Sequence, residues 1–482
     1  MSSPFPRSRR LALAVLCAGM LMIILDGSIV TVALPAIQDD LGLSPSGLTW
    51  IINAYLIAFG GLLLLAGRLG DLVGRRRMFV AGLVVFTAAS LLCGLATNQP
   101  MLIAMRFLQG AGGAMASAVS LGMLVTHFPE PGERAKAIGA FSFVGAAGAS
   151  IGQVIGGILT QAVSWHWIFF VNLPVGAAAA LLAVRVLEPD EGLGLRAGAD
   201  ALGALLVTGG LMVGVYTIVE TNRFGWASAH TLGLASLTVV LLAGFVVRQA
   251  TAAAPVLPLR MFRSRNVSVA NLVQVLMVSA LFGFQILITL YLQNVRGYGP
   301  AETGLALLPA AVMIAIVSLG LSARLAGRFG ERDVLLAGLA LLVVAIGLLT
   351  RLPADAGYVV DLLPTMLLAG GFGLAISAIT TLGMSGAGPG DAGVVSGLFN
   401  TAQQVGGALG VAVLSTFAAA RAERLLAGGH DRAGALTGGF HLAFGIGTGL
   451  LITAFVLTAA LLRRPETPAA EEAPVPAASP AA

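Results

Sequence analysis

Long apolar segments recur along the whole chain and constrain its fold more than any other feature. About fourteen of them come close to or exceed the roughly 20 residues that a helix needs to cross a bilayer core. Charged residues make up only 10% of the 482 residues, whereas soluble proteins average about 25%. The chain is therefore predicted to be an all-α integral membrane protein. A nucleic-acid binder, a cytoplasmic enzyme and a disulfide-rich secreted domain are excluded.

The apolar segments form groups of six, two and six. A cytoplasmic N-terminus (1–10) precedes a six-helix bundle (11–190), two inserted helices (198–250), a second six-helix bundle (266–463) and a disordered cytoplasmic tail (464–482). The first segment is also compatible with a secretory signal peptide, but it is long enough to span and is interpreted as the first helix. The predicted spans lie near 11–34, 48–67, 78–97, 101–125, 136–160, 167–187, 200–220, 230–248, 268–292, 303–325, 334–351, 358–384, 393–418 and 439–462.

Basic residues are distributed unequally between the two sides that fourteen spans would create. With the N-terminus inside, 20 of the 27 Lys and Arg residues fall in inner segments, 6 fall in outer loops and one, Arg106, lies within a span. Positive residues concentrate in the cytoplasmic loops of membrane proteins. The distribution therefore predicts a multi-pass protein with both termini in the cytoplasm.

A short motif occurs at corresponding positions of the two bundles. The segment GRLGDLVGRRR (67–77) aligns with ARLAGRFGERD (323–333), and each copy joins the second and third helices of its bundle. Duplicated halves around a midplane site are typical of secondary transporters. A duplicated bundle without transport activity is the alternative.

Several segments resemble the major facilitator superfamily, and within it the fourteen-helix branch of drug:proton antiporters. The resemblance covers about residues 10–462. The loop motif at 67–77 is typical of the superfamily, RFLQGAGGA (106–114) is similar to its fourth-helix arginine motif, and LDGSIVTVALP (25–35) is similar to the first-helix signature of the branch. Further similar segments are SWHWIFFVNLPVG (164–176), YLQNVRGYGPAETGLALLP (291–309) and SGLFNTAQQVGGALG (396–410).

The resemblance implies a major facilitator fold, with two six-helix bundles plus two additional transmembrane helices. It also implies export of drug-like or antibiotic small molecules in exchange for protons by alternating access. Asp71 would act as a cytoplasmic latch between the halves in the outward-facing state, and a local turn without a gating role is the alternative. The gate residues are Gly67, Arg68, Asp71, Gly74, Arg75 and Arg76.

The fifth predicted helix carries glycine at every fourth residue, at Gly148, Gly152 and Gly156, followed by Gly157. This spacing gives a flat face for close helix approach, and the resemblance assigns antiporter directionality to the same face. The chain departs from the family pattern at Gln153, where a proline that would bend the helix is expected. In the second copy of the loop motif, Gly327 also replaces an aspartate.

Asp26 and Arg106 are ionisable residues deep within predicted spans. A charge at the centre of a membrane helix costs about 2.5–3.5 kcal/mol on insertion scales and faces the bundle interior. At 1.5 Å per residue the two side chains reach a similar depth in a core of about 30 Å. We therefore predict that Arg106 and Asp26 interact and that Asp26 carries the coupled proton. A purely structural Asp26, and an Arg106 that reaches the outer surface, are the alternatives. Glu220, Asp361 and His441 are weaker candidates.

Amide side chains form helix faces that we predict to line the substrate cavity. Buried amides cost several kcal/mol when their hydrogen bonds are unsatisfied, so these faces are expected to line water or neighbouring helices, and bonds between helices are the alternative. A wall of amides, methionines and phenylalanines suits bulky amphipathic substrates. The cavity residues are Asn53, Gln153, Asn271, Gln274, Gln285, Asn400, Gln403 and Gln404.

Motifs of other functional classes are missing from the sequence. It contains no G-x-x-x-x-G-K-[ST] phosphate loop, and its five histidines and two cysteines lack metal-ligand spacing. We expect no enzyme activity, cofactor, metal site or nucleic-acid partner. The expected partners are the lipid bilayer, protons and small amphipathic molecules, and the expected state is a monomer.

The predicted function is proton-driven export of drug-like or antibiotic compounds across a bacterial cytoplasmic membrane. Three alternatives stay open on the sequence. They are an exporter of one endogenous metabolite, a nutrient symporter of the same fold, and a membrane sensor or scaffold.

Overall fold

The computed structural model describes residues 7–128, 130–194, 200–253, 255–384 and 392–462, and within these ranges the chain is helical and has no β-strand. Twelve of the described helices are long and apolar enough to cross a membrane. Two further apolar helices, Ile151–Ala162 and Pro300–Ile316, are shorter. The predicted all-α membrane fold is confirmed, with twelve candidate spans where the sequence predicted fourteen. The predicted tail, 464–482, lies outside the described residues.

The helices occur in the same order as the predicted spans. The first half contains α1 (Arg7–Leu41), α2 (Pro45–Val73), α3 (Arg75–Gly94), α4 (Gln99–His127), α5 (Pro131–Ala162), α6 (Trp167–Phe170) and α7 (Asn172–Val186). The inserted pair is α8 (Ala201–Phe224) and α9 (Ala229–Thr251). The second half contains the short helix η2 (Leu259–Arg263), then α10 (Arg265–Asn294), α11 (Pro300–Ile316), η3 (Val317–Leu321), α12 (Ser322–Phe329), α13 (Glu331–Leu349), η4 (Tyr358–Leu362), α14 (Leu363–Leu368), α15 (Gly370–Met384), α16 (Ala392–Ala427) and α17 (Arg432–Leu461).

Polar residues between the apolar segments fix where helices begin. Ser44 caps α2 and Asn98 caps α4, each by accepting the backbone N–H of the residue three positions later. Asp200 caps α8 and Asp431 caps α17 in the same way. Such caps pair N–H groups that the first turn of a helix leaves without a partner. The helix starts are therefore set by the short polar segments of the sequence.

Buried apolar side chains divide into two large clusters. One cluster is built mainly from α1 to α8, with contributions from α10 and α16. The other is built from α10 to α17. In a bilayer, helices associate through van der Waals packing and hydrogen bonds rather than through exclusion of water. Because α16 contributes to both clusters, it is one of the helices through which the two halves meet.

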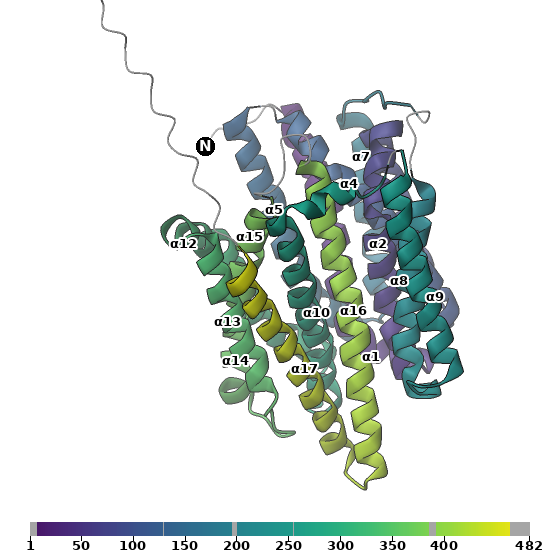
Figure 1. Ribbon diagram of the computed structural model, residues 1–482, viewed down its shortest axis with the longest axis vertical. Coiled ribbons are helices and arrows are strands. Elements are labelled where there is room, and N and C mark those ends of the chain that lie inside the picture. The colour runs from purple at the N-terminus through teal and green to yellow at the C-terminus, as the bar shows by residue number, and fades with distance from the viewer. Residues whose placement is uncertain (1–6, 129, 195–199, 254, 385–391, 463–482) are drawn as a thin grey trace, which may run out of the picture.

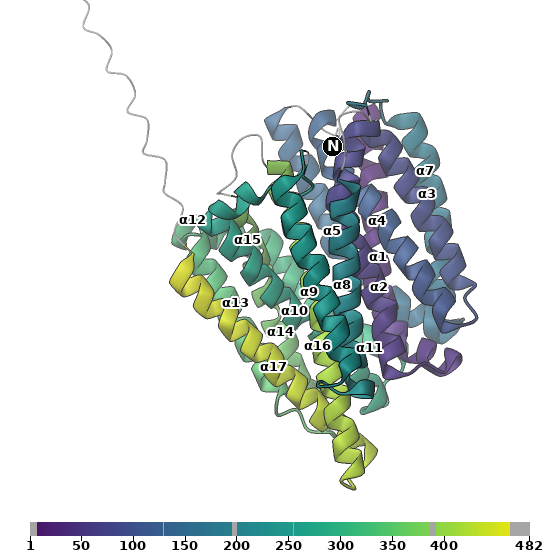
Figure 2. The same cartoon turned by 45° about the vertical axis from the view of Figure 1, so that its right-hand side comes forward.

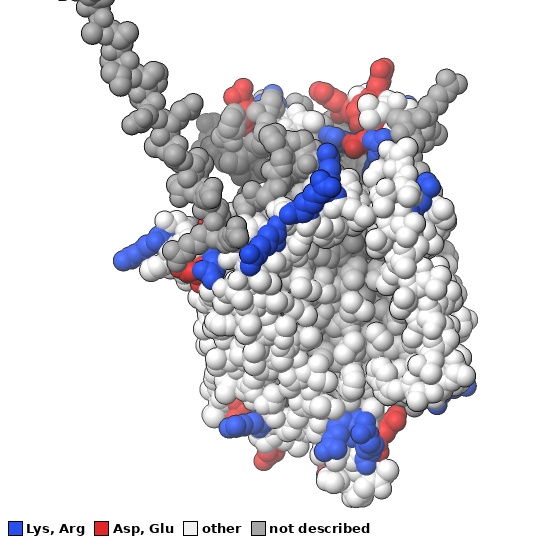
Figure 3. All heavy atoms as spheres, viewed as in Figure 1, with Lys and Arg blue, Asp and Glu red and all other residues white. Residues whose placement is uncertain are grey.

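The inserted pair lies over the boundary between the halves (Figures 1 and 2). α8 packs against α9, α2 and α16, so it touches both halves. We call the end of the molecule with the start of α1 and the α2–α3 loop the terminus face, and the end with the α1–α2 and α16–α17 loops the opposite face. Figure 3 shows charged residues at these two ends and a wide band without charge between them, as expected of a bundle that crosses a bilayer.

Two predicted helices are interrupted in the structure. The predicted span 303–325 is divided into α11, a π-helical turn (η3) and α12, and the span 358–384 begins with a second π-helical turn (η4). Such turns accommodate an extra residue within a helix. Beside η3, Gly373 of α15 approaches the backbone of Ile314 and Ser318. After η4, Pro364 lacks the N–H that a regular turn requires.

Other helices extend beyond their predicted ends. α16 continues to Ala427 and α17 already begins at Arg432. Three arginines that the predicted spans leave in an outer loop are therefore helical, namely Arg421, Arg424 and Arg432. Arginine is a good helix former, so helices can continue past the apolar core. The chain turns between α16 and α17 at Gly429, where a φ of 86° suits glycine.

Candidate functional site

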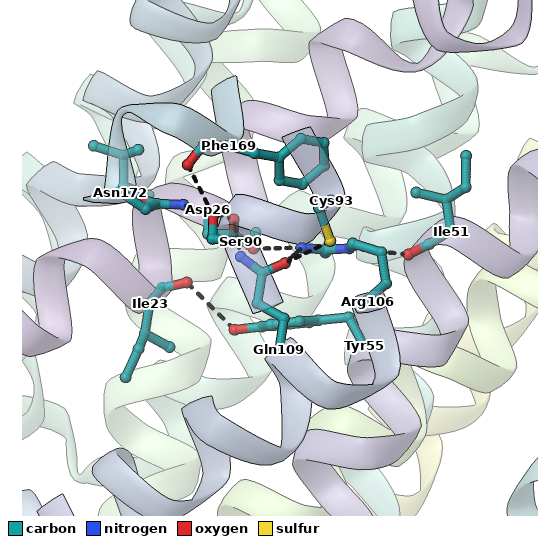
Figure 4. A network of polar contacts seen from close by, with 12 residues as sticks. Ile23, Asp26, Ile51, Tyr55, Ser90, Cys93, Arg106, Gln109, Phe169 and Asn172 are labelled. Atoms are coloured by element: carbon teal, nitrogen blue, oxygen red, sulfur yellow. Dashed lines mark hydrogen bonds and ion pairs between the residues drawn. The ribbon is translucent and has the colours of Figure 1, made fainter. Parts of the chain in front are cut away.

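Asp26 is fully buried in the first half, where three side chains surround its carboxylate (Figure 4). Oδ2 accepts a hydrogen bond from Arg106 Nη1 at 2.5 Å. Oδ1 accepts one from Gln109 Nε2 at 2.8 Å and one from Asn172 Nδ2 at 3.0 Å. Helices α1, α4 and α7 therefore meet at one carboxylate. The structure brings Asp26 and Arg106 together as the sequence predicts.

Arg106 is enclosed as completely as its partner, with 2% of its surface exposed. Its Nε donates to the backbone oxygen of Ile51 at 3.2 Å, and Nη1 also donates to Gln109 Oε1 at 2.7 Å. The guanidinium carbon lies 4.4 Å from the ring centroid of Tyr55, within the range of a cation–π contact. Arg106 therefore does not reach the surface of the protein, which excludes that alternative for this conformation.

Gln109 and Asn172 are members of the site that were not predicted from the sequence. Gln109 bridges the ion pair, because its amide donates to Asp26 and accepts from Arg106. Asn172 also donates to Ser90 Oγ at 3.1 Å, which ties α3 to the cluster. Both residues belong to segments that resemble family motifs, 106–114 and 164–176, and motif position was the available signal. Periodicity within one helix does not show which helices meet.

The arrangement makes the charges of Asp26 and Arg106 depend on one another. Removing one partner of a buried ion pair costs about 3–5 kcal/mol, because the other charge is left uncompensated. The two side chains are therefore held together by opposite charge as well as by a hydrogen bond, and loss of either charge would destabilise the cluster. Asp26 has no exposed surface, so its carboxylate does not contact solvent in this conformation.

Residues of the loop motif lie together on the terminus face, where α2, α3 and α7 meet. Asp71 accepts a hydrogen bond from Arg75 at 3.0 Å, one helical turn away. Arg76 donates to the backbone oxygen of Val184 in α7. Among the described residues, these contacts join only parts of the first half, and a latch across the two halves stays a prediction. The remaining gate residues lie in or directly after the last turns of α2, at Gly67, Arg68 and Gly74.

Asp190, which the sequence analysis did not single out, caps α3. Its carboxylate accepts the backbone N–H groups of Arg75 at 2.6 Å and Arg76 at 3.0 Å. Leu193 N–H then bonds to the backbone oxygen of Asp71 at 2.9 Å. We call residues 188–194 the strap, because this segment holds the α2–α3 loop. Asp190 lies 115 positions from Arg75, so no local pattern signals the contact.

The cap is charged under physiological conditions. Partial burial alone would raise the pKa of Asp190, but hydrogen bonds from the backbone of Arg75 and Arg76 and the charge of Arg75 hold that pKa below its usual value. A depressed pKa means that the carboxylate adds stability above the unfolded pKa of about 3.9 and loses it as the pH falls through the lower folded value. The strap is therefore expected to stay attached at neutral pH.

An Asp190→Ala variant is expected to loosen the α2–α3 loop. Loss of a helix cap typically costs about 1 kcal/mol, so the amides of Arg75 and Arg76 should exchange hydrogen about fivefold faster at neutral pH. Hydrogen exchange followed by mass spectrometry measures this directly, with the exposed neighbour Glu191→Ala as the control. Equal exchange in the two variants would contradict the assignment of Asp190 as the cap.

Three of the helix-five glycines face α1, the helix that carries Asp26. A Cβ atom placed on Gly152 would lie 2.0 Å from Ser28 Oγ, and one on Gly156 would lie 2.6 Å from the Ile29 side chain. A Cβ on Gly148 would also contact α1, at 3.0 Å. The glycine spacing thus brings α5 and α1 into close contact. The directionality that the resemblance assigns to this face stays a prediction.

The fourth glycine, Gly157, faces the other half. A Cβ atom there would lie 2.4 Å from the backbone oxygen of Pro300 at the start of α11. One turn further along α5, Gln161 Oε1 accepts the backbone N–H of Ala301 at 3.1 Å. The halves are therefore in direct contact at the opposite face, through α5 and α11.

Two further contacts close the same face. Gln293 Nε2 of α10 donates to the backbone oxygen of Val32 in α1 at 2.9 Å. A Cβ atom on Gly304 of α11 would lie 2.5 Å from the backbone oxygen of Gln153. Gln153 itself lies within α5, which is helical from Pro131 to Ala162.

Four of the eight predicted cavity amides are buried, and none of the eight lines the two pockets described for this structure. Asn53 and Gln274 have no exposed surface, and neither amide has a hydrogen-bond partner among the described residues. Asn271 donates to the Val267 oxygen of its own helix at 2.8 Å. Gln153 is buried, Gln285, Gln403 and Gln404 are half-buried, and Asn400 is exposed.

One pair of these amides does share an interface. A Cβ atom on Gly60 of α2 would lie 2.7 Å from Gln404 Cβ of α16. Asn53 lies seven residues before Gly60, which is about two helical turns, so it lies on the same face of α2. Gln404 therefore belongs to the contact between α2 and α16, and Asn53 lies on the face of α2 that makes this contact. Their role in substrate binding stays a prediction.

Two bundles of apolar helices, a duplicated loop motif and a buried ion pair in one bundle together define a membrane transporter built from two halves. The chain matches the family model described as Major Facilitator Superfamily over residues 16–411. It belongs to that family and is a multi-pass membrane transporter.

Several relatives are named as antibiotic resistance or export proteins. The chain is 39% identical to puromycin resistance protein pur8 of Streptomyces alboniger, over 94% of this chain and 91% of that protein. It is 38% identical to cephamycin export protein CmcT of Amycolatopsis lactamdurans, over 84% of each chain. It is 37% identical to the tetracenomycin C resistance and export protein of Streptomyces glaucescens, over 85% of this chain and 76% of that protein.

Solved structures support the fold. A bacterial homolog of the human lysosomal transporter Spinster, in an inward-facing and unoccupied conformation, superposes with a TM-score of 0.69 at 16% identity. That comparison covers 97% of this chain and 100% of the other.

Proposed function

We propose that this protein exports antibiotic or drug-like small molecules in exchange for protons, by alternating access. The observation that carries the proposal is the buried pair of Asp26 and Arg106, held at 2.5 Å inside one half of a two-part transporter. A carboxylate whose partner is a buried arginine has two states, paired and protonated, and each favours a different packing of its surroundings. The names of the relatives support export as the direction of transport.

We further propose that α5 and α11 complete a set of fourteen spans. α5 has 32 residues, enough to cross a core of about 30 Å, and α11 continues through η3 into α12. Fourteen spans place both termini on the same side, and the basic residues identify it as the cytoplasm. The terminus face is then cytoplasmic and the opposite face is the outer face. The bundles 11–190 and 266–463 flank the inserted pair, 198–250.

The contacts between the halves support assigning the structure to one state of the proposed cycle. Three contacts between the halves lie on the outer face. They are Gly157 against Pro300, Gln161 bonded to Ala301, and Gln293 bonded to Val32. An outward-facing state must break these contacts, and the Asp71 latch on the cytoplasmic face would then hold the halves together. The structure therefore fits a state in which α1 and α5 are closed against α10 and α11 on the outer side.

A second candidate function is export of one particular metabolite. Three relatives are each named for a single antibiotic: puromycin, cephamycin and tetracenomycin C. A specific exporter and a multidrug exporter share the same fold and the same coupling pair. They differ in how many unrelated compounds are transported.

Drug accumulation in bacterial cells that express the protein tests the proposal. We expect lower accumulation of ethidium or puromycin than in cells with the empty vector, and a return to the control level after a protonophore discharges the gradient. The gradient is sufficient, because each charge moved is worth about 2.3 kcal/mol per 100 mV. Export of a single compound from a chemically diverse panel favours the second candidate. Export that persists after the protonophore would rule out proton coupling.

A further inference from the structure

A pocket of about 720 Å³ opens on the outer face, away from the Asp26 cluster. Its wall is built from three parts of the chain: the α1–α2 end of the first half, α8 of the inserted pair, and α10, α16 and α17 of the second half. Sites for small molecules typically have volumes of about 300–1,000 Å³. The pocket is therefore large enough for a drug-sized molecule, and its shape depends on how the two halves are arranged.

Aromatic contacts hold the inserted pair over this boundary. Trp50 of α2 lies against Tyr216 of α8, with ring centroids 6.2 Å apart. Trp226, in the α8–α9 loop, stacks on Phe417 of α16 with centroids 5.8 Å apart. The contact between Trp50 and Tyr216 joins the inserted pair to the first half, and the contact between Trp226 and Phe417 joins it to the second half. The inserted helices are thus fixed to both sides of the outer pocket.

The lining of the pocket combines apolar, uncharged polar and charged residues. Its apolar residues include Leu48, Val219, Leu287, Leu290 and Phe440, and its uncharged polar residues are Gln38, Ser44, Thr49, Asn294, Ser415 and Thr416. The charged lining residues are Glu220, Arg223, Glu423 and Arg432.

These four charged residues differ in exposure. Arg223, Glu423 and Arg432 are exposed, so water and salt screen their charges. Glu220 alone is half-buried, and no hydrogen bond or ion pair joins its carboxylate to a side chain that the structure describes. Among the charged lining residues, the one that is partly withdrawn from water is therefore a carboxylate with no hydrogen bond or ion pair to a described side chain.

We propose that this pocket binds an amphipathic organic cation, with Glu220 as its charge partner. The apolar wall would cover the hydrophobic body of the ligand, and the carboxylate would face its positive group. A carboxylate in an apolar pocket interacts more strongly with a cation than it would in bulk water, because the local dielectric constant is lower. The pocket lies on the outer face, so it would act as the site from which cargo leaves. This role as an exit site rests on the export function proposed above.

Equilibrium binding to the purified, full-length protein tests the proposal with two probes of the same shape and opposite charge. Tetraphenylphosphonium is the cation and tetraphenylborate is the anion. A Glu220→Gln variant is expected to weaken phosphonium binding about tenfold and to leave borate binding equal or stronger. Glu220→Asp keeps the charge and should retain most of the phosphonium affinity. Glu130→Gln, an exposed carboxylate on the cytoplasmic face, is the control for loss of one charge.

A second measurement does not depend on the fold of the Glu220 variants. Ser415 lines the pocket and is half-buried, so a Ser415→Cys variant places a thiol in the wall. Bound phosphonium is expected to slow its reaction with an impermeant thiol reagent several-fold, whereas borate should not. Three results would each overturn the proposal. They are an unchanged phosphonium affinity in Glu220→Gln, an equal loss of affinity for both probes, and no protection of the cysteine by phosphonium. Phosphonium export by cells separates the two proposals. If cells that express Glu220→Gln still export phosphonium and the purified variant still binds it, the outer site is refuted and the export function is not.

Discussion

An Asp26→Asn variant is expected to lose proton-driven export while remaining in the membrane. Asparagine keeps the shape of the side chain and one of the two oxygens that accept from Arg106, Gln109 and Asn172, but it does not take up or release a proton in the physiological range. We expect accumulation of an exported compound to return to the empty-vector level, with the protein still found in the membrane fraction. Accumulation assays combined with quantification of the protein in membranes check both parts of this prediction.

The same substitution leaves Arg106 buried without its counter-charge, so its effect on stability must be separated from its effect on coupling. Loss of one partner of a buried pair costs about 3–5 kcal/mol, and thermal unfolding in detergent should show a marked decrease. The double variant Asp26→Asn/Arg106→Gln removes both charges and is expected to regain much of that stability without regaining export. Full export by either variant would show that Asp26 does not carry the proton.

A Gly157→Val variant is expected to prevent the outer face from closing. The new Cβ atom would lie 2.4 Å from the Pro300 oxygen and 2.8 Å from Ala301 Cα. Because both neighbours are backbone atoms, the contact is relieved only if α5 and α11 move apart. The outward-facing state should then dominate and transport should fall to near background. Cysteines at positions 161 and 301 report the separation, because their cross-linking should become at least about tenfold slower as the population shifts.

Two matched glycines serve as controls for this experiment. A Cβ atom on Gly209 of α8 would meet nothing within 4 Å, so Gly209→Val is expected to transport normally and to cross-link like the parent protein. Gly156 faces Ile29 of α1 within the first half, so Gly156→Val should lower stability without a specific loss of cross-linking. If Gly157→Val cross-links positions 161 and 301 at the parental rate, the outer contact is not the gate that we describe.

The sequence predicted the fold well where the signal is local. Uninterrupted apolar segments located the helices, and the repeated motif at 67–77 and 323–333 located corresponding turns in the two halves. Departures occur where backbone geometry depends on a distant neighbour. The π-helical turn at 317–321 lies where Gly373 of α15 comes close, and no periodicity within 303–325 contains that information.

The candidate site was predictable in part for the same reason. Asp26 and Arg106 stand out because a charge inside an apolar helix requires a partner, and similar depth was enough to pair them. Gln109 and Asn172 complete the cluster only because α4 and α7 meet at α1, and Asp190 reaches α3 across 115 residues. Asn53 and Gln274 were predicted to line a cavity, but no local pattern shows where either buried amide lies in the packed bundle.

Proton movement in reconstituted vesicles tests the central claim most directly. Vesicles would contain the purified protein and a trapped pH indicator, and a gradient of an exported compound would be applied across the membrane. For the parent protein we predict proton movement opposite to the compound, and none in the Asp26→Asn variant even where that variant still exchanges compound for compound. Proton movement of normal size in vesicles that contain Asp26→Asn would contradict the account.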